Sequence, residues 1–336
     1  MMKNNIFIRS SRRWMQSLAH DIGWNYIDGI NHQMSNLHKK NLKTAILTAI
    51  KRSILPPLEW FITYEQLTPI PKGIDLIIEP GSRLIKTKKK YIVYCENGLG
   101  IFSYNAKKIN AINIALAKRM IKKKNFVGFV FYSEASRKAA YSIFDKKTLE
   151  NKDLGVIYPY ANFKPSSSQT ANRFGFCSSL FILKGGRELV DVIHDNSALF
   201  RTSGLIFDIV TSLNSLPSEY KRKIQELSDI IHTYDFNLNK EEFEELTSKW
   251  QWYIHCSYFD SCPLSIIEMK QSGKHIIATS NFAIPELLQS DDIILKDPKS
   301  VFDEITFLPK ERLFLDDFII ENSLESAKYE RSLYDD

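Results

Sequence analysis

The stretch HCSYFDSCPLSIIEMKQSGKHIIATSNFAIPELL, residues 255–287, decides how we interpret the fold. An apolar strand ending at Ile254 runs into a polar loop, and Pro263 then opens a helix that ends at Gly273. A second apolar strand, Ile276–Thr279, follows and leads into another loop. A strand, a helix and a second strand in this order are the repeating unit of proteins built on parallel sheets, so the stretch predicts an α/β fold.

The start of the predicted helix has the features of an anion site. Proline is favoured at the first position of a helix, and Ser261 or Cys262 stands where a capping residue is expected. The backbone N–H groups over Cys262–Ser265 would then point outward at the carboxyl end of a strand. Such a helix start attracts anions, and phosphate is the usual occupant.

Glu268 lies within the same helix and has two interpretations. On an ideal helix it shares one narrow stripe with Ser265 and Ser272, while apolar side chains cover most of the remaining surface. An acid on a mostly buried helix should have a hydrogen-bond partner, which is either a ligand hydroxyl or a basic side chain in a structural salt bridge. The spacing alone leaves both interpretations open.

The length of 336 residues predicts two domains. An apolar fraction of 44% and a charged fraction of 25% are typical of a water-soluble globular protein. The four cysteines include no CxxC pair and no histidine partners at zinc spacing, so we expect reduced thiols and no metal site.

No apolar run reaches the length of about 18 residues that a membrane span needs, and the N-terminus MMKNNIFIRSSRRW lacks the apolar core of a signal peptide. We therefore expect a cytoplasmic protein with at most peripheral membrane contact. The net charge of +6 and the pI of 8.9 suit phosphate-bearing substrates, anionic lipid or nucleic acid, and they do not choose among these partners.

Short apolar runs bounded by turn residues recur along the chain and predict buried parallel strands. They are Ile6–Ile8, Trp60–Thr63, Asp75–Glu79, Tyr91–Cys95, Phe126–Tyr132, Phe174–Cys177, Leu205–Val210, Ile230–Tyr234 and Ile293–Leu295. The first run precedes a basic turn, Arg9–Arg13, and a helical pattern, which suits the first unit of a doubly wound sheet. That turn lacks the glycine-rich fingerprint of dinucleotide binders, which argues against a nicotinamide or flavin cofactor.

Helical patterns lie between these runs, among them residues 35–53 and 240–250. Residues 104–124 predict an amphipathic helix whose inward side chains are Ile109, Ile112, Leu116 and Met120. Its basic residues gather near the C-terminal end, where the helix dipole favours them. They form either a solvated face or a contact with an anionic membrane surface or a lipid-phosphate acceptor.

Two further loops carry polar groups directly after predicted strands. Glu96-Asn97 follows Tyr91–Cys95, at the edge where open α/β sheets bind their ligands. Lys184-Gly185-Gly186 stands at a helix start and looks like a phosphate cradle, although it lacks the P-loop spacing GxxxxGK[ST]. Between these loops, Ala161–Arg173 is rich in Ser, Asn and Pro and is the best candidate for an interdomain linker.

Four segments, taken in order, resemble the GT-B glycosyltransferases of family 4, which are retaining enzymes that use nucleotide sugars. DSCPLSIIEMKQSGKHIIATSNFAIPEL is similar to the ExxxxxxxE signature of that family, with Asp260 in place of the first glutamate and Glu268 as the second. SSLFILKGG is similar to its G-R-x-F-x-x-K-G-G element. LNKEEFEELTSKWQWYIHCS is similar to the segment before the signature, and FVGFVFYSEASRKAA to the end of the N-terminal domain.

The resemblance implies a GT-B fold, in which two Rossmann-like, doubly wound parallel-sheet domains face each other across a cleft. It places an acceptor domain at residues 1–165, a nucleotide-sugar-binding domain at 166–310, and a helical segment at 311–336 that would pack back on the first domain. The implied reaction transfers a hexose from a UDP- or GDP-sugar to a lipid, a polysaccharide or another glycan with retention of configuration. It needs no metal and no cofactor.

The resemblance also assigns the site. Glu96, Asn97 and Asp260 would contact the transferred sugar. Lys184 would bind the diphosphate, and Glu268 would accept hydrogen bonds from the ribose hydroxyls. The full set of donor-binding residues would be Ser178, Ser179, Lys184, Gly185, Cys262, Pro263, Leu264, Ser265 and Glu268.

The sequence departs from the family pattern at some of these positions. Ser178 and Ser179 stand where the family has Gly and usually Arg, Asp260 has a shorter reach than Glu, and the N-terminal glycine-rich loop is absent. A GT-B-like protein that binds a nucleotide or glycan without transferring it therefore stays an alternative. The sequence shows no helix-turn-helix, zinc-finger or aromatic–basic motif, which argues against a nucleic-acid binder.

Overall fold

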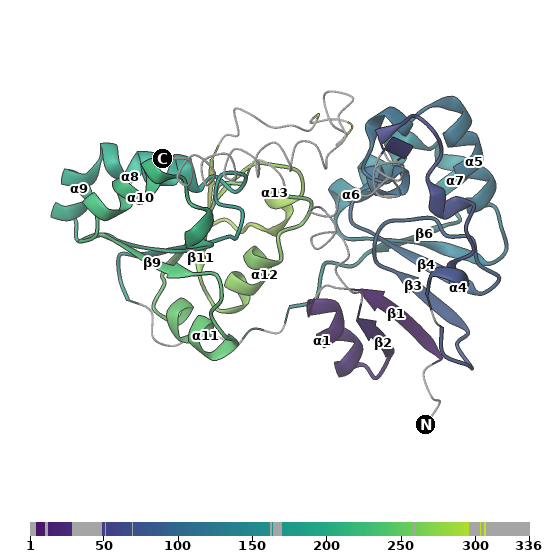
Figure 1. Ribbon diagram of the computed structural model, residues 1–336, viewed down its shortest axis with the longest axis horizontal. Helices are drawn as coiled ribbons and strands as arrows, with labels where there is room; N and C mark the ends of the chain where they lie inside the picture. The colour runs from purple at the N-terminus through teal and green to yellow at the C-terminus, as the bar shows by residue number, and fades with distance from the viewer. Residues whose placement is uncertain are drawn as a thin grey trace, which may run out of the picture. The chain divides into compact units, whose positions relative to one another are not determined.

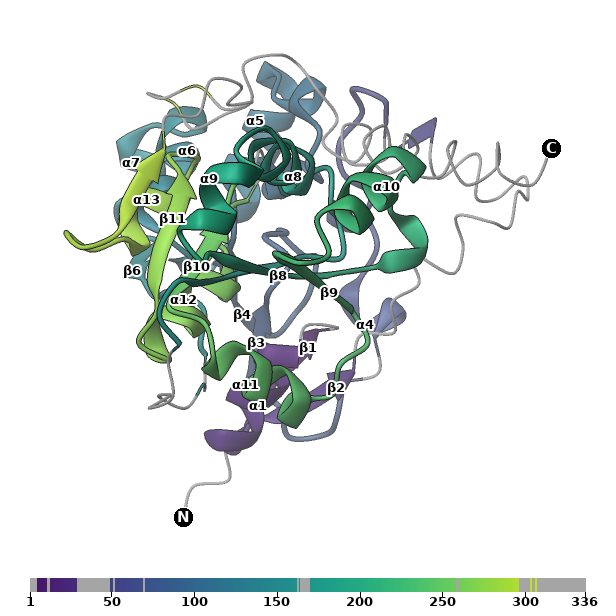
Figure 2. The same cartoon turned by 90° about the vertical axis from the view of Figure 1, so that its left-hand side faces the viewer.

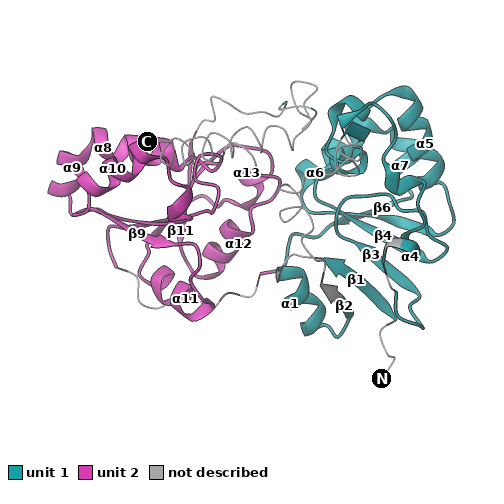
Figure 3. Cartoon of the chain, in the orientation of Figure 1, with its two compact units in different colours: residues 1–160, 302–315 teal, residues 161–301, 316–336 magenta. Residues whose placement is uncertain are grey.

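The computed structural model describes residues 5–10, 13–28, 49–50, 52–68, 70–161, 163, 170–257, 260–295, 303 and 306. The described residues up to 160, with 303 and 306, form one compact unit, and those from 161 to 295 form a second (Figure 3). We call them unit 1 and unit 2. The predicted C-terminal segment 311–336 lies outside the described residues, as does most of the helix predicted at 35–53.

Unit 1 is built on a parallel sheet with the strand order β2-β1-β3-β4-β5-β6. Its strands are β1 (Ile6–Ser10), β2 (Asn25–Asp28), β3 (Leu76–Glu79), β4 (Lys90–Cys95), β5 (Phe126–Phe131) and β6 (Asp153–Val156). Figure 1 shows α1 (Arg13–Asp21) on one side of this sheet and α5 (Ala111–Ile121), α6 (Glu134–Ile143) and α7 (Lys146–Leu149) on the other. Phe126, Phe129 and Phe131 of the inner strand β5 are fully buried, which is why this run is apolar almost throughout.

Unit 2 repeats this design with the order β12-β11-β10-β7-β8-β9, again with every neighbouring pair parallel. The strands are β7 (Arg173–Cys177), β8 (Ile206–Thr211), β9 (Ile231–Asp235), β10 (Trp252–His255), β11 (His275–Thr279) and β12 (Ile293–Leu295). One face carries α8 (Gly186–Asp195), α9 (Ser197–Thr202) and α10 (Ser218–Glu226), and the other carries α11 (Lys240–Ser248) and α12 (Leu264–Gln271) (Figures 1 and 2).

The strand orders confirm the predicted α/β fold with two doubly wound parallel sheets. In such a sheet the chain winds outward in both directions from one point, and ligands bind there, beyond the carboxyl ends of the strands. This switch point lies between β1 and β3 in unit 1 and between β7 and β10 in unit 2. Within the described part of the chain, no helix is long and apolar enough to span a bilayer.

Two local predictions in unit 1 were wrong. The run Trp60–Thr63 is no strand: Leu58–Trp60 is a 3-10 helix after Pro57, and Trp60 is buried with its ring edge toward Phe102. The helix predicted over residues 104–124 is shorter, because the side chain of Asn110 caps a helix that begins at Ala111. Ile112 therefore points outward and is 73% exposed, although the sequence pattern predicts an inward side chain.

A glycine–tryptophan contact fixes the packing of unit 2. Trp250 is fully buried, and its indole lies where a side chain on Gly175 of β7 would stand, with a Cβ there only 2.0 Å from the ring. The indole N–H donates a 2.8 Å hydrogen bond to Asp208 of β8, which also accepts two hydrogen bonds from Arg173. The glycine thus lets a large aromatic side chain reach a buried carboxylate.

This contact predicts a stability effect. Gly175→Ala forces the ring aside, and overpacking of this kind costs about 1–3 kcal/mol of the free energy of unfolding. Gly204→Ala in the same unit is the matched control, since Gly204 has a positive φ of 64° but nothing near its Cβ position. Urea unfolding should show that Trp250→Phe offsets the first substitution and not the second. If Gly175→Ala lowers the free energy of unfolding equally whether residue 250 is Trp or Phe, the packing account is contradicted.

Candidate functional site

Lys184 and Asp260 form an ion pair at the carboxyl edge of the second sheet. Lys184 lies in the turn between β7 and α8, and Asp260 lies in the loop after β10, the two strands that flank the switch point. The Lys184 Nζ is 2.7 Å from Asp260 Oδ2, and both side chains are about one-fifth exposed. The structure therefore brings together the predicted diphosphate contact and the predicted sugar contact, and it pairs them with each other.

His255, which the sequence analysis did not single out, supports the same carboxylate. It is the last residue of β10, is 5% exposed, and has its Nε2 3.4 Å from Asp260 Oδ2. Burial lowers the pKa of His255 despite the opposing effect of Asp260. Burial alone would raise the pKa of Asp260, but the charge of Lys184 and the close approach of His255 outweigh it and hold that pKa well below its usual range. Asp260 is therefore charged at neutral pH.

The two glycines after Lys184 are required by space. Gly185 has a φ of 78°, which favours glycine, and a Cβ there would stand 2.3 Å from the carbonyl oxygen of Cys256. A Cβ on Gly186 would stand 2.3 Å from the ring of Phe181. The turn thus packs directly against the end of β10, and Lys184 reaches Asp260 because of this close approach.

The start of α12 differs slightly from the prediction. The helix is Leu264–Gln271, so Pro263 is its N-cap residue rather than its first helical residue, and this proline has no side-chain group that could cap the helix. The N–H groups of Leu264 and Ser265 make no hydrogen bond to any described residue, as expected for the first turn of a helix. This helix start lies in the same loop as Asp260 and offers N–H donors to an anion.

Glu268 is half-buried, and no described residue supplies a compensating charge to its carboxylate. Burial raises its pKa to about 7, and among the described residues its carboxylate has no hydrogen bond and no ion pair. Cys177, the last residue of β7, is close enough to be affected by its charge. Burial and, to a smaller extent, the charge of Glu268 raise the pKa of the Cys177 thiol to about 12. The alternative of a structural salt bridge is therefore not what the described residues show.

Ser178 serves the turn that leads to Lys184. Its N–H donates to Val210 O at 2.9 Å, and its Oγ accepts from the N–H of Leu180 at 3.0 Å. Ser179 is half-buried next to it. The serine hydroxyls add no positive charge beside Lys184. The arginine that the family named in the sequence analysis usually has at this position is therefore absent.

In unit 1, Glu96 and Asn97 follow β4 as predicted, and they differ in exposure. Glu96 is half-buried, its N–H donates to Ser82 Oγ at 2.7 Å, and its carboxylate accepts from the hydroxyl of Tyr104 at 3.2 Å. Asn97 is fully buried, and its Oδ1 accepts from the N–H of Leu99 at 2.8 Å. Glu96 is the more accessible of the two, while Asn97 shapes the loop.

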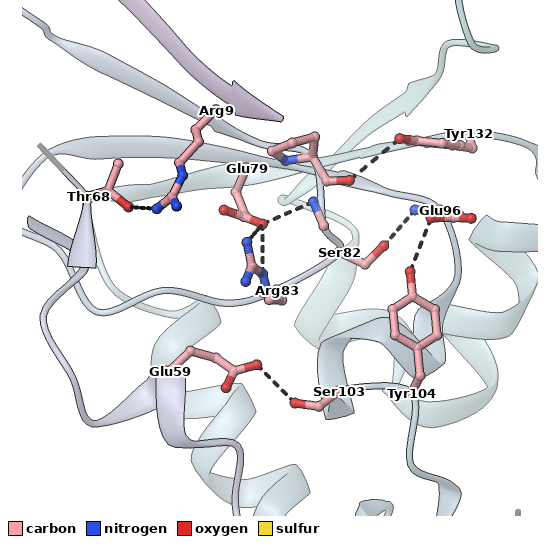
Figure 4. A network of polar contacts seen from close by, with 12 residues as sticks. Arg9, Glu59, Thr68, Glu79, Ser82, Arg83, Glu96, Ser103, Tyr104 and Tyr132 are labelled. Carbon is pink, nitrogen blue, oxygen red and sulfur yellow. Dashed lines mark hydrogen bonds and ion pairs between the residues drawn. The ribbon is translucent and has the colours of Figure 1, made fainter. Parts of the chain in front are cut away.

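The switch point of unit 1 carries a second network that the sequence analysis missed (Figure 4). Glu79 at the end of β3 is fully buried, and its Oε1 accepts from Arg83 Nε at 2.9 Å and Nη2 at 2.7 Å. Arg9 of β1 donates to Thr68 Oγ1 at 2.5 Å. One feature of the sequence could have revealed this network: Glu79 ends an apolar run directly before Pro80-Gly81.

One group of side chains in the described residues has the donor types of a metal site. Ligand atoms of His275, Asp291 and Asp292 lie within 4.8 Å of one another. The two Asp292 oxygens already accept from the N–H groups of Ile276 and Gln289, and the Lys270 ammonium is 2.8 Å from one of them. A cation would meet that ammonium, so we interpret the group as a structural ion-pair cluster.

The comparisons support the fold. No protein-family model and no curated protein matches the chain. HepE of Anabaena in complex with UDP-glucose is similar in structure, with a TM-score of 0.55 and 14% identity over 97% of this chain and 92% of that one. The complex of HepE with UDP and glucose gives a TM-score of 0.54 and 12% identity, covering 98% and 94%. The chain thus has the GT-B fold of these neighbours.

The buried acid predicts a pH-dependent stability. A carboxyl whose pKa rises on folding from its ordinary value of 4.5 to about 7 destabilises the folded state progressively as pH rises through that range. Glu268→Gln should therefore raise the free energy of unfolding by about 1–3 kcal/mol at pH 8 and leave it unchanged near pH 4. The exposed Glu241→Gln is the control. Denaturant unfolding at both pH values measures the difference, and a gain that does not depend on pH would contradict it.

The ion pair predicts a coupled effect. Lys184→Met leaves the half-buried Asp260 without its cation and should cost about 2 kcal/mol of stability, most of which the double variant with Asp260→Asn should recover. Because the pKa of Asp260 is lowered in the folded state, the cost should shrink as pH falls below about 4. Strictly additive costs in the double-mutant cycle would show that the two side chains do not interact.

Proposed function

We propose that the protein is a glycosyltransferase that moves a hexose from a nucleotide sugar, a UDP- or GDP-sugar, to a lipid, polysaccharide or other glycan acceptor. Retention of configuration and independence of metals and cofactors are parts of this proposal, as is a cytoplasmic location. The observation that carries it is the set Lys184, Asp260 and Glu268 at the switch point of unit 2, where doubly wound sheets bind nucleotides.

Lys184 and the first turn of α12 suit a diphosphate. The lysine supplies a positive charge, and the N–H groups of Leu264 and Ser265 supply donors aligned with the helix dipole. Both would stabilise the charge that develops on the leaving nucleoside diphosphate. Fixed charges and dipoles of this kind usually contribute more to catalysis than any other single effect, and they do not require a metal.

Glu268 suits the ribose. An ionised carboxylate accepts two hydrogen bonds at once, and the two ribose hydroxyls are vicinal donors. In the ligand-free protein, burial keeps a large share of this carboxyl protonated at neutral pH. Hydrogen bonds from the ribose hydroxyls to its oxygens would favour the charged form. The nucleotide sugar would thus supply the hydrogen-bond partners that Glu268 lacks among the described residues.

Asp260 and Glu96 are the proposed sugar contacts, with Asn97 behind Glu96 in its loop. Asp260 is bound to Lys184, so a diphosphate that binds Lys184 competes with this ion pair. Release of Asp260 would leave a charged carboxylate next to the diphosphate, in reach of the sugar hydroxyls. Binding of the diphosphate to Lys184 would therefore also free Asp260 to contact the sugar.

The second candidate is a GT-B-like protein that binds a nucleotide or glycan without transfer. The ion pair favours it, since Lys184 already has a partner and Ser178 and Ser179 bring no further positive charge. HepE has been captured with UDP-glucose, which makes UDP-glucose the first donor to test on this chain. Binding of a donor with neither hydrolysis nor transfer to any acceptor would favour the second candidate.

A donor panel tests the proposal. UDP- and GDP-sugars are scanned by thermal shift, because a ligand that binds only the folded state raises the melting temperature. Glu268→Gln and Lys184→Met should each weaken binding of the selected donor by about tenfold or more, as expected for lost hydrogen bonds to charged groups. Glu241→Gln should bind as the wild type does. The site assignment is wrong if both site variants keep wild-type binding and turnover.

A further inference from the structure

Acidic residues are absent from two long segments of unit 1. Aspartate and glutamate make up 39 of 336 residues, yet residues 29–58 and 97–133 contain none. The same two segments carry five and seven lysines and arginines, respectively. Positive charge is therefore concentrated in these segments, although the net charge of the whole chain is only +6.

The structure brings described parts of the two segments together. The carbonyl oxygen of Ile54 accepts hydrogen bonds from the side-chain amides of Asn110 at 3.2 Å and Asn113 at 3.0 Å. The ammonium of Lys108 donates to the carbonyl oxygens of Ile50 and Leu55. Lys108 is 1% exposed, and burial lowers its pKa. Buried polar groups thus fix the backbone of this loop against the start of α5.

With the backbone held in this way, apolar side chains face solvent. Ile54 is 65% exposed, Leu55 is 55% exposed, and Ile112 in the first turn of α5 is 73% exposed. Arg52, Lys107 and Arg119 are exposed in the same segments. Two carboxylates from neighbouring segments have partners: Glu59 accepts a hydrogen bond from the hydroxyl of Ser103, and Asp145 pairs with Lys118.

We propose that this surface, formed by Arg52, Ile54, Leu55, Lys107, Ile112 and Arg119, docks unit 1 on an anionic lipid bilayer. The basic side chains are attracted to the lipid headgroups, and the three apolar side chains enter the boundary between headgroups and acyl chains. Exposed apolar groups surrounded by basic ones mark such peripheral contacts. None of these six residues belongs to the donor site proposed in unit 2.

A bilayer explains more of the surface than another polyanion does. A nucleic acid or an acidic polysaccharide would use the lysines and arginines, but it would gain little from three exposed aliphatic side chains. A purely apolar partner would not account for the absence of acids across both segments. The combination of exposed isoleucine and leucine with basic residues in segments that lack acids fits an anionic bilayer.

Vesicle flotation tests the proposal on the full chain. The probes are vesicles of phosphatidylcholine alone and of phosphatidylcholine mixed with phosphatidylglycerol. The wild type should float with the mixed vesicles only. The double variants Ile54→Ser/Ile112→Ser and Lys107→Gln/Arg119→Gln should each bind the mixed vesicles about tenfold or more weakly, since each basic residue near the surface contributes roughly a factor of five.

Matched controls change the same residue types elsewhere. Leu199→Ser on α9, where Leu199 is 61% exposed, and Arg222→Gln/Lys240→Gln in unit 2 should leave binding unchanged. Equal binding to both kinds of vesicle, or none to either, would overturn the proposal. So would a loss that the charge variant shows and the serine variant does not, since that result describes a general polyanion site.

Discussion

The parallel pairing of β7 with β10 is the constraint on which the candidate site depends. It places the carboxyl ends of two strands that are far apart in sequence at one edge, and the chain leaves them in opposite directions. Lys184 arrives from the first strand and Asp260 from the second, and the 2.7 Å ion pair between them exists because Gly185 allows the two loops to touch. Without that close approach, the lysine and the acid would lie in two separate loops and would not be in contact.

The same constraint explains the unusual state of Glu268. Helix α12 covers the sheet beside β10 and β11, so Ile266 and Met269 are buried in the core, and most of its other residues, Glu268 among them, are half-buried. An acid among them loses most of its hydration and gains no counter-charge from the described residues. Such a loss of folding stability is expected where an acidic side chain binds a ligand instead of stabilising the fold.

The sequence predicted these features to different extents. Inner strands such as Phe126–Phe131 are apolar almost throughout and are recognisable, whereas β2 and β6 (NYID and DLGV) are edge strands with mixed patterns and were missed. Turn residues located Lys184 and Asp260, but spacing could not show that they pair, because that contact depends on tertiary packing across 76 residues. For the same reason the exposure of Ile112 was predicted wrongly: Asn110 and the loop at Ile54 set the helix start.

The central claim is that Glu268 is the donor's ribose ligand, and its ionisation is the most direct test. Carbon-13 NMR of the glutamate carboxyl groups, assigned with Glu268→Gln, gives the pKa of this residue without and with saturating UDP or GDP. The account predicts a pKa near 7 in the free protein and a clear fall with the nucleotide that binds. A pKa near 4.5 in the free protein, or one that bound nucleotide leaves unchanged, would contradict it.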